Sequence, residues 1–182
     1  MTSLEARQTL RIIDANLNRI GEGLRLLEDI ARLLLNDVAL TQQLKTMRHQ
    51  IIKDDWSFHQ QLLQARDSDG DVGINIEALG DEKQRELPTM VVANARRVQE
   101  ALRVMEELAK MPGTTPELDS EKFKQARFNL YTIEKALLSK LLRQEKTKHI
   151  PGLYAIIDSQ ALNRRSHIEA ARQIIRGGAK II

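Results

Sequence analysis

The sequence predicts a mainly α protein, in which two duplicated helical hairpins form a pseudo-two-fold bundle and a short β-α-β segment follows. Three observations predict this fold. Apolar residues recur at helical spacing in two long stretches, the charged residues of the first stretch recur 78 positions later, and residues 153–182 change to a strand, helix and strand pattern. The 182 residues are enough for one domain, or for a small domain and part of another.

The first and third predicted helices have the same apolar pattern. Intervals of four and three residues place these side chains on one face of an α-helix, where they can form a core. In the first helix they are Ile13, Leu17, Ile20, Leu24, Leu27 and Ala31. In the third helix they are Val91, Ala95, Val98, Leu102, Met105 and Ala109.

Polar residues of the first helix are repeated as well, side chain for side chain. Unrelated helices would share roughly one residue over this length, so the identity indicates an internal repeat. Eight residues between positions 15 and 31 are identical to those 78 positions later: Ala15, Asn16, Arg19, Glu22, Leu24, Arg25, Glu28 and Ala31.

The second and fourth predicted helices complete the two repeat units. We expect them at about 40–65 and 117–144, with "LKTMRHQI" at 44 matching "FKQARFNL" at 123. Their apolar positions are Leu44, Met47, Ile51, Phe58 and Leu62 in one, and Phe123, Leu130, Ile133, Leu137 and Leu141 in the other. The repeat units are therefore about 11–66 and 89–144, within a helical domain of residues 1–145.

The connecting segments are predicted from their glycine, proline and aspartate content. "MPGTTPELDS" at 111–120 supplies a stop, a turn and a cap between the third and fourth helices, and 66–89 is a long loop of the kind that often carries function. Residues 146–152 are expected to be a linker, 153–158 a buried strand, 166–178 a capped helix and 179–182 a strand.

A single β-α-β unit cannot close a parallel sheet, so the segment 153–182 needs something to cover it. Three arrangements stay open: pairing with a second copy in a homodimer, burial in a swapped arrangement, or a segment without fixed packing. Of the three we favour the homodimer.

Composition narrows the function classes. There is no run of about 18 uncharged apolar residues and no signal-peptide pattern at the start, so we expect a cytoplasmic protein that does not enter membranes. A net charge of +3 and only three Phe, two Tyr and one Trp argue against nucleic acid as a partner. Small anionic ligands bound by a few arginines suit this composition better.

Two groups of basic residues are candidates for anion binding. Arg19, Glu22, Arg25 and Glu28 are spaced three apart, which suits either an exposed ladder of ion pairs or a functional cluster. Lys45, Arg48 and His49 share one face of the second helix. They can hold a phosphate or balance acidic neighbours.

The loop "RDSDGDVG" at 66–73 is the candidate metal segment. Asp67, Asp69 and Asp71 resemble the start of a calcium loop, but Val72 and Ala78 stand where that loop needs Gly and Glu, so we reject an EF-hand. A magnesium site with one or two carboxylates and a nucleotide phosphate stays open, beside a polar turn with capping aspartates. The four histidines lack metal-ligand spacing, and His59 and His167 are expected at the surface.

Three motifs in this order resemble a known family. "DANLNRIGEGLRLLED" at 14–29, "LKTMRH" at 44–49 and "ARDSDGDVG" at 65–73 resemble the small helical hydroxymethylpyrimidine-phosphate kinases of thiamine biosynthesis, which occur alone or fused ahead of thiamine-phosphate synthase. The resemblance covers about residues 7–145. The tail "GLYAIIDSQALNRRSHIEAARQIIRGGAKII" resembles the first strand, helix and second strand of thiamine-phosphate synthase, a TIM barrel.

The resemblance implies transfer of the γ-phosphoryl group of ATP onto hydroxymethylpyrimidine phosphate, with Mg²⁺ as the cofactor. The acceptor phosphate is already anionic, so no side chain has to remove a proton, and cations must bring two polyanions together. The pyrophosphate- and magnesium-binding residues of the synthase would lie beyond Ile182. The resemblance thus implies that the synthase part is too short to be active.

The resemblance and the distribution of charge together give a set of candidate site residues. We assign catalytic roles to Arg25, Lys45 and Arg48, and a magnesium site to Asp67 and Asp71. Phosphate-binding candidates are Arg19, His49, Arg66, Arg97, Arg103, Lys124 and Arg127, with Asn16, Glu22 and Glu28 in support. The candidates of the second repeat are either binding residues or scaffold.

Two other functions are kept as alternatives. One is a non-catalytic helical assembly or anion-binding module attached to thiamine-phosphate synthase. The other is a general nucleic-acid binder, which predicts steep salt dependence and no preference for ATP.

Overall fold

The computed structural model describes residues 3–52, 55–73, 86–111, 118–148, 152–162 and 165–182. The chain divides into two compact units, and the division along the sequence falls between Ser139 and Lys140. The elements are α1 (Ser3–Asp29), a π-helical turn η1 (Ile30–Leu34), α2 (Val38–Ile51), α3 (Trp56–Ala65), α4 (Leu87–Leu108), α5 (Ser120–Lys148), β1 (Leu153–Tyr154), α6 (His167–Arg176) and β2 (Ala179–Ile181). The predicted mainly α fold with a short β-α-β segment is confirmed.

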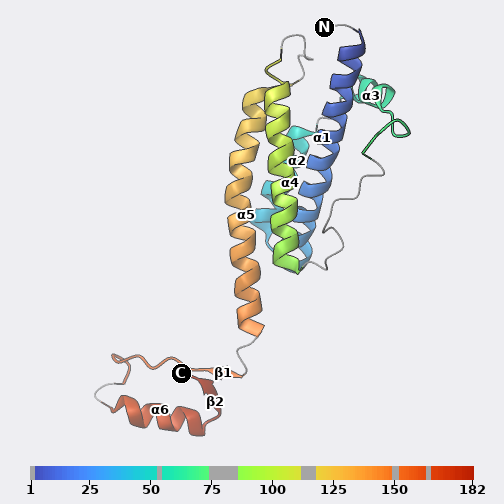
Figure 1. Ribbon diagram of the computed structural model, residues 1–182. Helices are drawn as coiled ribbons and strands as arrows, with labels where there is room; N and C mark the ends of the chain where they lie inside the picture. Colours follow the sequence, from blue (N-terminus) through green and yellow to red (C-terminus); the bar gives the residue numbers. More distant parts are fainter. Residues whose placement is uncertain (1–2, 53–54, 74–85, 112–117, 149–151, 163–164) are drawn as a thin grey trace. The chain divides into compact units, whose positions relative to one another are not determined.

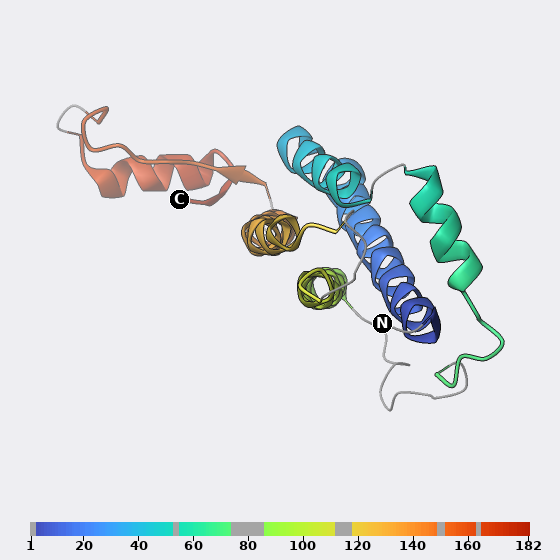
Figure 2. The same ribbon diagram turned by 90° about the horizontal axis from the view of Figure 1, so that it is seen from above.

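The first helices of the two repeats, α1 and α4, pack against each other in the helical unit. The helices α2 and α3 also pack on α1, while α5 runs beside α4 (Figure 1). Seen from above, α3 and α4 lie on different sides of α1 (Figure 2). A hydrogen bond of 2.6 Å from Gln99 Nε2 to Glu134 Oε2 joins α4 to α5.

The predicted apolar faces form the core. Every residue predicted for the apolar face of the second and fourth helices is buried, and so are all but one in each of the first and third helices. The exceptions, Leu17 and Ala109, are half-buried. Helical spacing alone therefore located most of the core, although it missed Ile30, Leu40, Ala65, Ala101 and Ala126.

The end of α1 is set by a change of helical winding. In η1 the backbone N–H of Leu35 donates to the carbonyl oxygen of Ile30 (3.1 Å), and Asn36 then takes a positive φ of 49°. Asp37 follows as the N-cap of α2, and its Oδ1 accepts from the N–H of Leu40 (3.0 Å). The chain therefore reverses here, and α2 can pack back onto α1.

The predicted second helix at 40–65 is wrong in one respect, because it is two helices. α2 ends with Ile52 in an extended conformation, and Asp55 then caps α3 by accepting from the backbone N–H groups of Ser57 and Phe58. The side chain of Asp55 competes with a continuing helix for these donors. In the second repeat the equivalent positions, 131–134, lie inside the unbroken helix α5.

The unit formed by residues 140–182 contains the end of α5 and the β-α-β segment. β1 and β2 pair in parallel, with Leu153 opposite Ala179 and Tyr154 opposite Ile181. The predicted buried strand at 153–158 is wrong in length and burial, because β1 has two residues and both are exposed. Two short strands and one helix cannot cover both faces of a sheet.

Other boundaries differ slightly from the prediction. α5 continues to Lys148, past the predicted start of the linker at 146. α6 begins after Ser166, whose side chain makes no capping hydrogen bond, and ends before Gly177 and Gly178. Residues 74–85 of the predicted loop and 112–117 of the predicted turn lie outside the described residues. None of the helices in the described part of the chain has an apolar stretch that could cross a membrane.

Candidate active site

Each repeat contains a buried glutamate that binds an arginine from the next helix. Glu28 on α1 accepts from Arg48 Nε on α2 at 3.0 Å, and Glu106 on α4 accepts from Arg127 Nη2 on α5 at 2.9 Å. Both glutamate side chains are only 4% exposed. A buried carboxylate without its arginine would be strongly unfavourable, so these pairs explain why the repeat retains both residues.

Flanking cations extend both ion pairs to the surface. Arg25 lies 3.8 Å from Glu28, and Arg103 lies 2.9 Å from Glu106. These i, i+3 contacts are part of the ion-pair ladder that the spacing suggests. Lys110 also contacts Glu106, at 3.2 Å.

The electrostatic surroundings lower the pKa of Glu106. The hydrogen bond from Arg127 is the largest cause, and Lys110 and Arg103 add to it, while desolvation acts in the opposite direction. The pKa of the Glu106 carboxyl falls from 4.5 to about 2. Glu106 is therefore an ion-pair partner at neutral pH and unsuited to accept a proton from a substrate.

The repeated asparagines have a local role. Asn16 Nδ2 donates to the carbonyl oxygen of Ile12 at 2.8 Å, and Asn94 Nδ2 donates to that of Met90 at 2.9 Å. Each asparagine thus binds its own helix one turn back. Asn16 is buried, and its amide nitrogen is engaged in this bond.

A hollow lined by arginines lies between the first half of α1 and the segment that follows α3. We call it the arginine hollow; its volume is about 530 Å³. It is lined by Gln8, Arg11, Ile12, Asp14, Ala15, Asn16, Asn18, Arg19, Arg66, Asp67, Ser68 and Asp71. Five of these residues, Asn16, Arg19, Arg66, Asp67 and Asp71, were predicted as site residues from the sequence.

Arg66 is held in the arginine hollow by a bidentate ion pair with Asp14. Its Nε and Nη2 atoms each lie 2.8 Å from an oxygen of Asp14, which is nearly buried on α1. This hydrogen bonding raises the pKa of Arg66. Arg19 lines the same hollow and, within the described residues, forms no ion pair or side-chain hydrogen bond. The hollow thus combines two guanidinium groups bound to aspartates, those of Arg11 and Arg66, with the unpaired one of Arg19.

The predicted metal residues, Asp67 and Asp71, hold two tight turns. Asp67 Oδ1 accepts from the N–H of Gly70 at 3.0 Å, and Asp71 Oδ1 accepts from that of Gly73 at 2.9 Å. Arg11 donates to the carbonyl oxygen of Asp67 at 3.0 Å and so ties the segment to α1. The second oxygen of Asp67, Oδ2, lies 3.8 Å from Arg11 Nη1, and both carboxylates line the arginine hollow.

Asp67 and Asp71 could supply carboxylate oxygens to a magnesium ion that also binds phosphate oxygens. Such an ion needs only one or two protein carboxylates besides phosphate and water oxygens. Among the described residues there is no group of three or more His, Asp or Glu side chains that could hold a metal ion unaided.

A more enclosed cavity adjoins the arginine hollow, with Asp14 and Asn18 in both linings. We call it the inner cavity; its volume is about 310 Å³. It is lined by Asp14, Leu17, Asn18, Gly21, Glu22, Gln50, Ile51, Ile52, Asp55, Phe58, His59, Leu62, Leu118, Asp119, Lys122 and Phe123. Its lining therefore combines apolar side chains with eight polar or charged ones, four of which are carboxylates.

The break between α2 and α3 produces this cavity. Ile52 and Asp55 line it from the break itself, and Phe58 and Leu62 line it from α3. A Cβ atom at Gly21 would lie 2.7 Å from Ile52 Cδ1, so glycine lets the two segments approach. The second repeat has Gln99 at the position equivalent to Gly21, and it has no break.

Several predicted site residues lie outside both openings. Arg25 and Arg48 flank Glu28, while Lys45, His49 and Arg97 are exposed. In the second repeat Arg103 and Arg127 line a separate hollow of about 350 Å³ with Arg96, Gln99, Glu100 and Tyr131, and Lys124 binds Glu121 at 3.3 Å. Glu22 lines the inner cavity. The three residues predicted as catalytic therefore do not line the arginine hollow with Arg19.

The sequence reasoning missed Arg11, Asp14, Asn18 and His59. His59 is exposed, as expected, and it also lines the inner cavity; its ring lies 6.1 Å from that of Trp56. A signal was present for the other three. They stand where the repeat fails, because Thr89, Val92 and Arg96 occupy the equivalent positions. The arginine hollow is thus lined both by residues that differ between the two repeats and by residues, such as Asn16 and Arg19, that are identical in them.

Comparison with known proteins agrees with the extent of the helical unit. The family model described as the ThiD2 family matches residues 11–136. A thiamine-phosphate synthase of Rhodopirellula baltica is 45% identical over 112 residues, which cover 60% of this chain and 30% of that protein. No solved structure matches.

Longer matches include the β-α-β segment. The thiamine-phosphate synthase of Nostoc punctiforme is 34% identical over 94% of this chain and 46% of its own length. That of Thermosynechococcus vestitus is 34% identical over 98% of this chain and 48% of its own length. The chain spans about half the length of these two relatives, or less. Since the family model covers well over half of the chain, the protein belongs to the ThiD2 family.

Proposed function

We propose that this chain acts in thiamine biosynthesis as a phosphotransferase that converts hydroxymethylpyrimidine phosphate to its diphosphate, with ATP as the donor and Mg²⁺ as the cofactor. An oxygen of the acceptor phosphate attacks the γ-phosphorus of ATP. The bond from that phosphorus to the bridging oxygen breaks, and ADP leaves. Membership of the ThiD2 family and the relationship to thiamine-phosphate synthases support this proposal.

The observation that carries the proposal is that the arginine hollow and the inner cavity lie next to each other and share Asp14 and Asn18 in their linings. A pyrimidine ring suits the inner cavity, whose volume is at the lower end for ligand sites. The phosphate on that ring then reaches the arginine hollow, where Arg19 and Arg66 can bind it.

Each side chain has a role that follows from its contacts. Asp14 fixes the guanidinium of Arg66, and Arg19 is free to bind a phosphoryl oxygen. Asp67 and Asp71 would hold the magnesium ion through their outer oxygens, which would neutralise the phosphates as they meet. No general base is required, because the acceptor oxygen is already ionised.

The predicted catalytic residues Arg25, Lys45 and Arg48 form a second, weaker candidate for anion binding. Arg48 is already committed to Glu28, and Lys45 is exposed on α2. We assign the phosphotransfer to the arginine hollow and no catalytic step to residues 153–182.

The test is an assay with purified protein, Mg²⁺, ATP and hydroxymethylpyrimidine phosphate, in which ³¹P NMR detects the diphosphate. Arg19→Ala should lower kcat/KM about 100-fold, because a cation at the transferring phosphoryl group is lost. Arg32→Ala is the matched control, since Arg32 is an exposed arginine on η1 that pairs with Asp29.

Each result has a defined meaning. Activity in the wild type, with loss in Arg19→Ala and little change in Arg32→Ala, supports the assignment. If Lys45→Ala is inactive and Arg19→Ala is active, the phosphates bind on α2 instead. Folded wild-type protein that forms no diphosphate contradicts the proposed function and favours an assembly or anion-binding module.

A further inference from the structure

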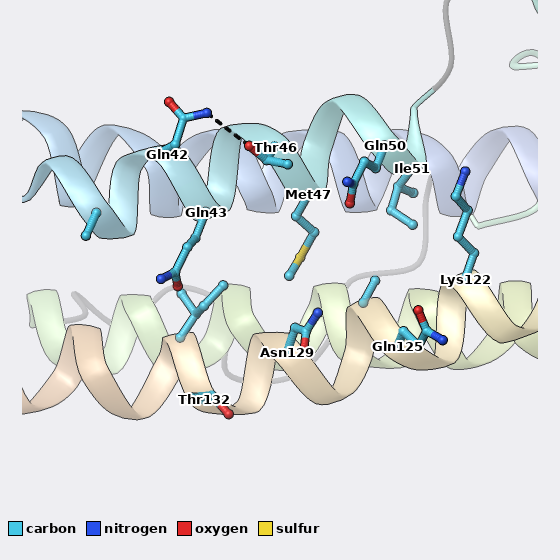
Figure 3. A pocket seen from close by; sticks show the side chains of 13 residues that line it. Gln42, Gln43, Thr46, Met47, Gln50, Ile51, Lys122, Gln125, Asn129 and Thr132 are labelled. Atoms are coloured by element: carbon cyan, nitrogen blue, oxygen red, sulfur yellow. Dashed lines mark hydrogen bonds between the residues drawn. The ribbon is translucent and has the colours of Figure 1, made fainter.

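A third opening lies between α2 and α5, the two equivalent second helices of the repeats. We call it the amide groove; its volume is about 840 Å³. Gln43 and Met47 point from α2 toward α5, and Asn129 points from α5 toward α2 (Figure 3). The groove is therefore formed by side chains that the repeat places opposite one another.

Uncharged amides dominate the polar lining of this groove. Within the described residues, Gln43, Gln50, Gln125 and Asn129 form no side-chain hydrogen bond. Each amide offers two donors and an acceptor. The side of the groove thus carries donors and acceptors that are free to recognise a ligand.

The base of the amide groove is apolar. Met47 and Ile51 contribute from α2, and Ala126 and Ile133 from α5, and all four are nearly buried. A flat ring placed on these side chains would be desolvated on one face, while its edge could meet the amides. This combination is typical of sites for aromatic heterocycles.

The amide groove is continuous with the site already described. Gln50, Ile51 and Lys122 line both the groove and the inner cavity. Among the described residues that line the groove, Lys122 is the one that carries a charge, and it lies at the junction. A ligand with an uncharged ring and an anionic end would therefore have its anionic end directed toward Lys122, at the edge of the inner cavity.

We propose that the amide groove binds the adenine nucleoside of the phosphoryl donor, with its phosphates directed past Lys122. This inference rests on the proposed function and deepens it, because it separates the donor site from the acceptor site. An Asn or Gln side chain can form two hydrogen bonds with the N6 and N7 edge of adenine. The groove volume lies within the usual range for ligands of this size.

Other occupants fit the groove less well. A second copy of the chain would be expected to cover an apolar surface, whereas this lining carries four free amides. A nucleic acid strand would need more cations than Lys122 alone. The mixture of amides, one lysine and an apolar base favours a single nucleotide.

The test uses residues that line only the amide groove. Gln125→Ala and Asn129→Ala change exposed helical positions on α5 that line neither the inner cavity nor the arginine hollow. Alanine favours helix, so both variants should fold. Gln61→Ala on α3 is the control, because Gln61 is an exposed glutamine that lines none of the three openings.

The first measurement is steady-state kinetics with the full chain. The double variant Gln125→Ala/Asn129→Ala should raise the KM for ATP about tenfold and leave the KM for the pyrimidine phosphate within twofold. Gln61→Ala should leave both values unchanged. An unchanged KM for ATP in the double variant overturns the inference while the proposed function stands.

The second measurement does not depend on turnover. In calorimetric titration with Mg·ATP the double variant should bind about tenfold more weakly than the wild type. This result supports the inference even if no diphosphate is formed, so the two proposals can fail separately. Equal binding by both proteins, no binding by the wild type, or a dimer that the double variant dissociates overturns it.

Discussion

Glu106 and Glu28 show how identical residues differ in electrostatic surroundings. Both accept a hydrogen bond from an arginine on the following helix. Glu106 is also close to Arg103 and Lys110, at 2.9 and 3.2 Å, and its pKa falls to about 2. Three cations around one carboxylate favour its ionised form more than burial opposes it.

The lowered pKa of Glu106 predicts a defined dependence of stability on pH. A carboxyl whose pKa is lower in the folded state stabilises that state above its unfolded value of 4.5. This stabilisation is lost as the pH falls from 4.5 toward about 2. Glu106→Gln should therefore be less stable than the wild type in urea unfolding at pH 7, and the difference should shrink toward pH 2.

The neighbouring Glu107 provides the control for this measurement. It binds Arg103 and Lys110 on the surface, with a side chain that is 53% exposed. Exposed ion pairs contribute little, so Glu107→Gln should change stability by less than about 1 kcal/mol at either pH. A difference for Glu106→Gln that stays constant from pH 7 to pH 2 would contradict the assigned ion-pair role.

Residue roles could be predicted where one helix determines them. The buried positions of Leu24 and Leu102 follow from spacing, and the capping role of aspartates was among the alternatives for the loop at 66–73. The ion pair between Asp14 and Arg66 could not be predicted from the sequence, because the two residues are 52 positions apart and their contact depends on how α3 packs on α1. Long-range pairing of charges needs the tertiary arrangement.

Among the elements, α1 and α4 approach closely at Gly23. A Cβ atom there would lie 2.3 Å from Val98 Cγ2 and 3.4 Å from the carbonyl oxygen of Asn94. The equivalent residue of the second repeat is Ala101, which is buried. The repeat is thus symmetric in pattern and asymmetric where the two first helices touch.

Gly23→Ala should destabilise the helical unit by about 2 kcal/mol, because the added methyl group would push into Val98 and the backbone of α4. Alanine favours helix over glycine, so in an open position the same change would stabilise. Urea unfolding followed by circular dichroism at 222 nm measures the effect. If Gly23→Ala stabilises the protein, α1 and α4 do not approach at this residue.

The break between α2 and α3 could not be predicted from apolar spacing. Ile51 and Phe58 keep a helical interval of seven across it, as do Leu130 and Leu137 in the unbroken α5. The core pattern differs at one position, because Asp54 stands in the sequence where α5 has the buried Ile133, and a single polar residue does not by itself end a helix. The cap at Asp55 supplies the stop. The spacing of apolar residues predicts which face of a helix packs on the core, but it does not predict where the helix ends.

At the scale of the whole molecule, one repeat is broken and the other is continuous. The broken repeat lines the inner cavity and the arginine hollow with α1, α2 and α3, whereas α5 contributes its first turns to the cavity. The sequence predicted the duplicated helices and the acidic loop, and so placed five residues of the hollow. It assigned the catalytic residues to the first repeat and the metal residues to the loop after it, and left the role of the second repeat open, because identities between the repeats do not show which of them lines a cavity.

Trp56 lies beside the inner cavity, so its fluorescence can report on ligand binding in the broken repeat. It is the one tryptophan among 182 residues, it begins α3, and its ring lies 6.1 Å from that of His59 in the lining of the inner cavity. Its fluorescence emission should therefore change, saturably, when hydroxymethylpyrimidine phosphate is added, and Trp56→Phe should abolish the signal. If the emission spectrum does not change when the compound is added, the compound binds elsewhere. The unlabelled protein thus contains an intrinsic fluorescent probe of the inner cavity.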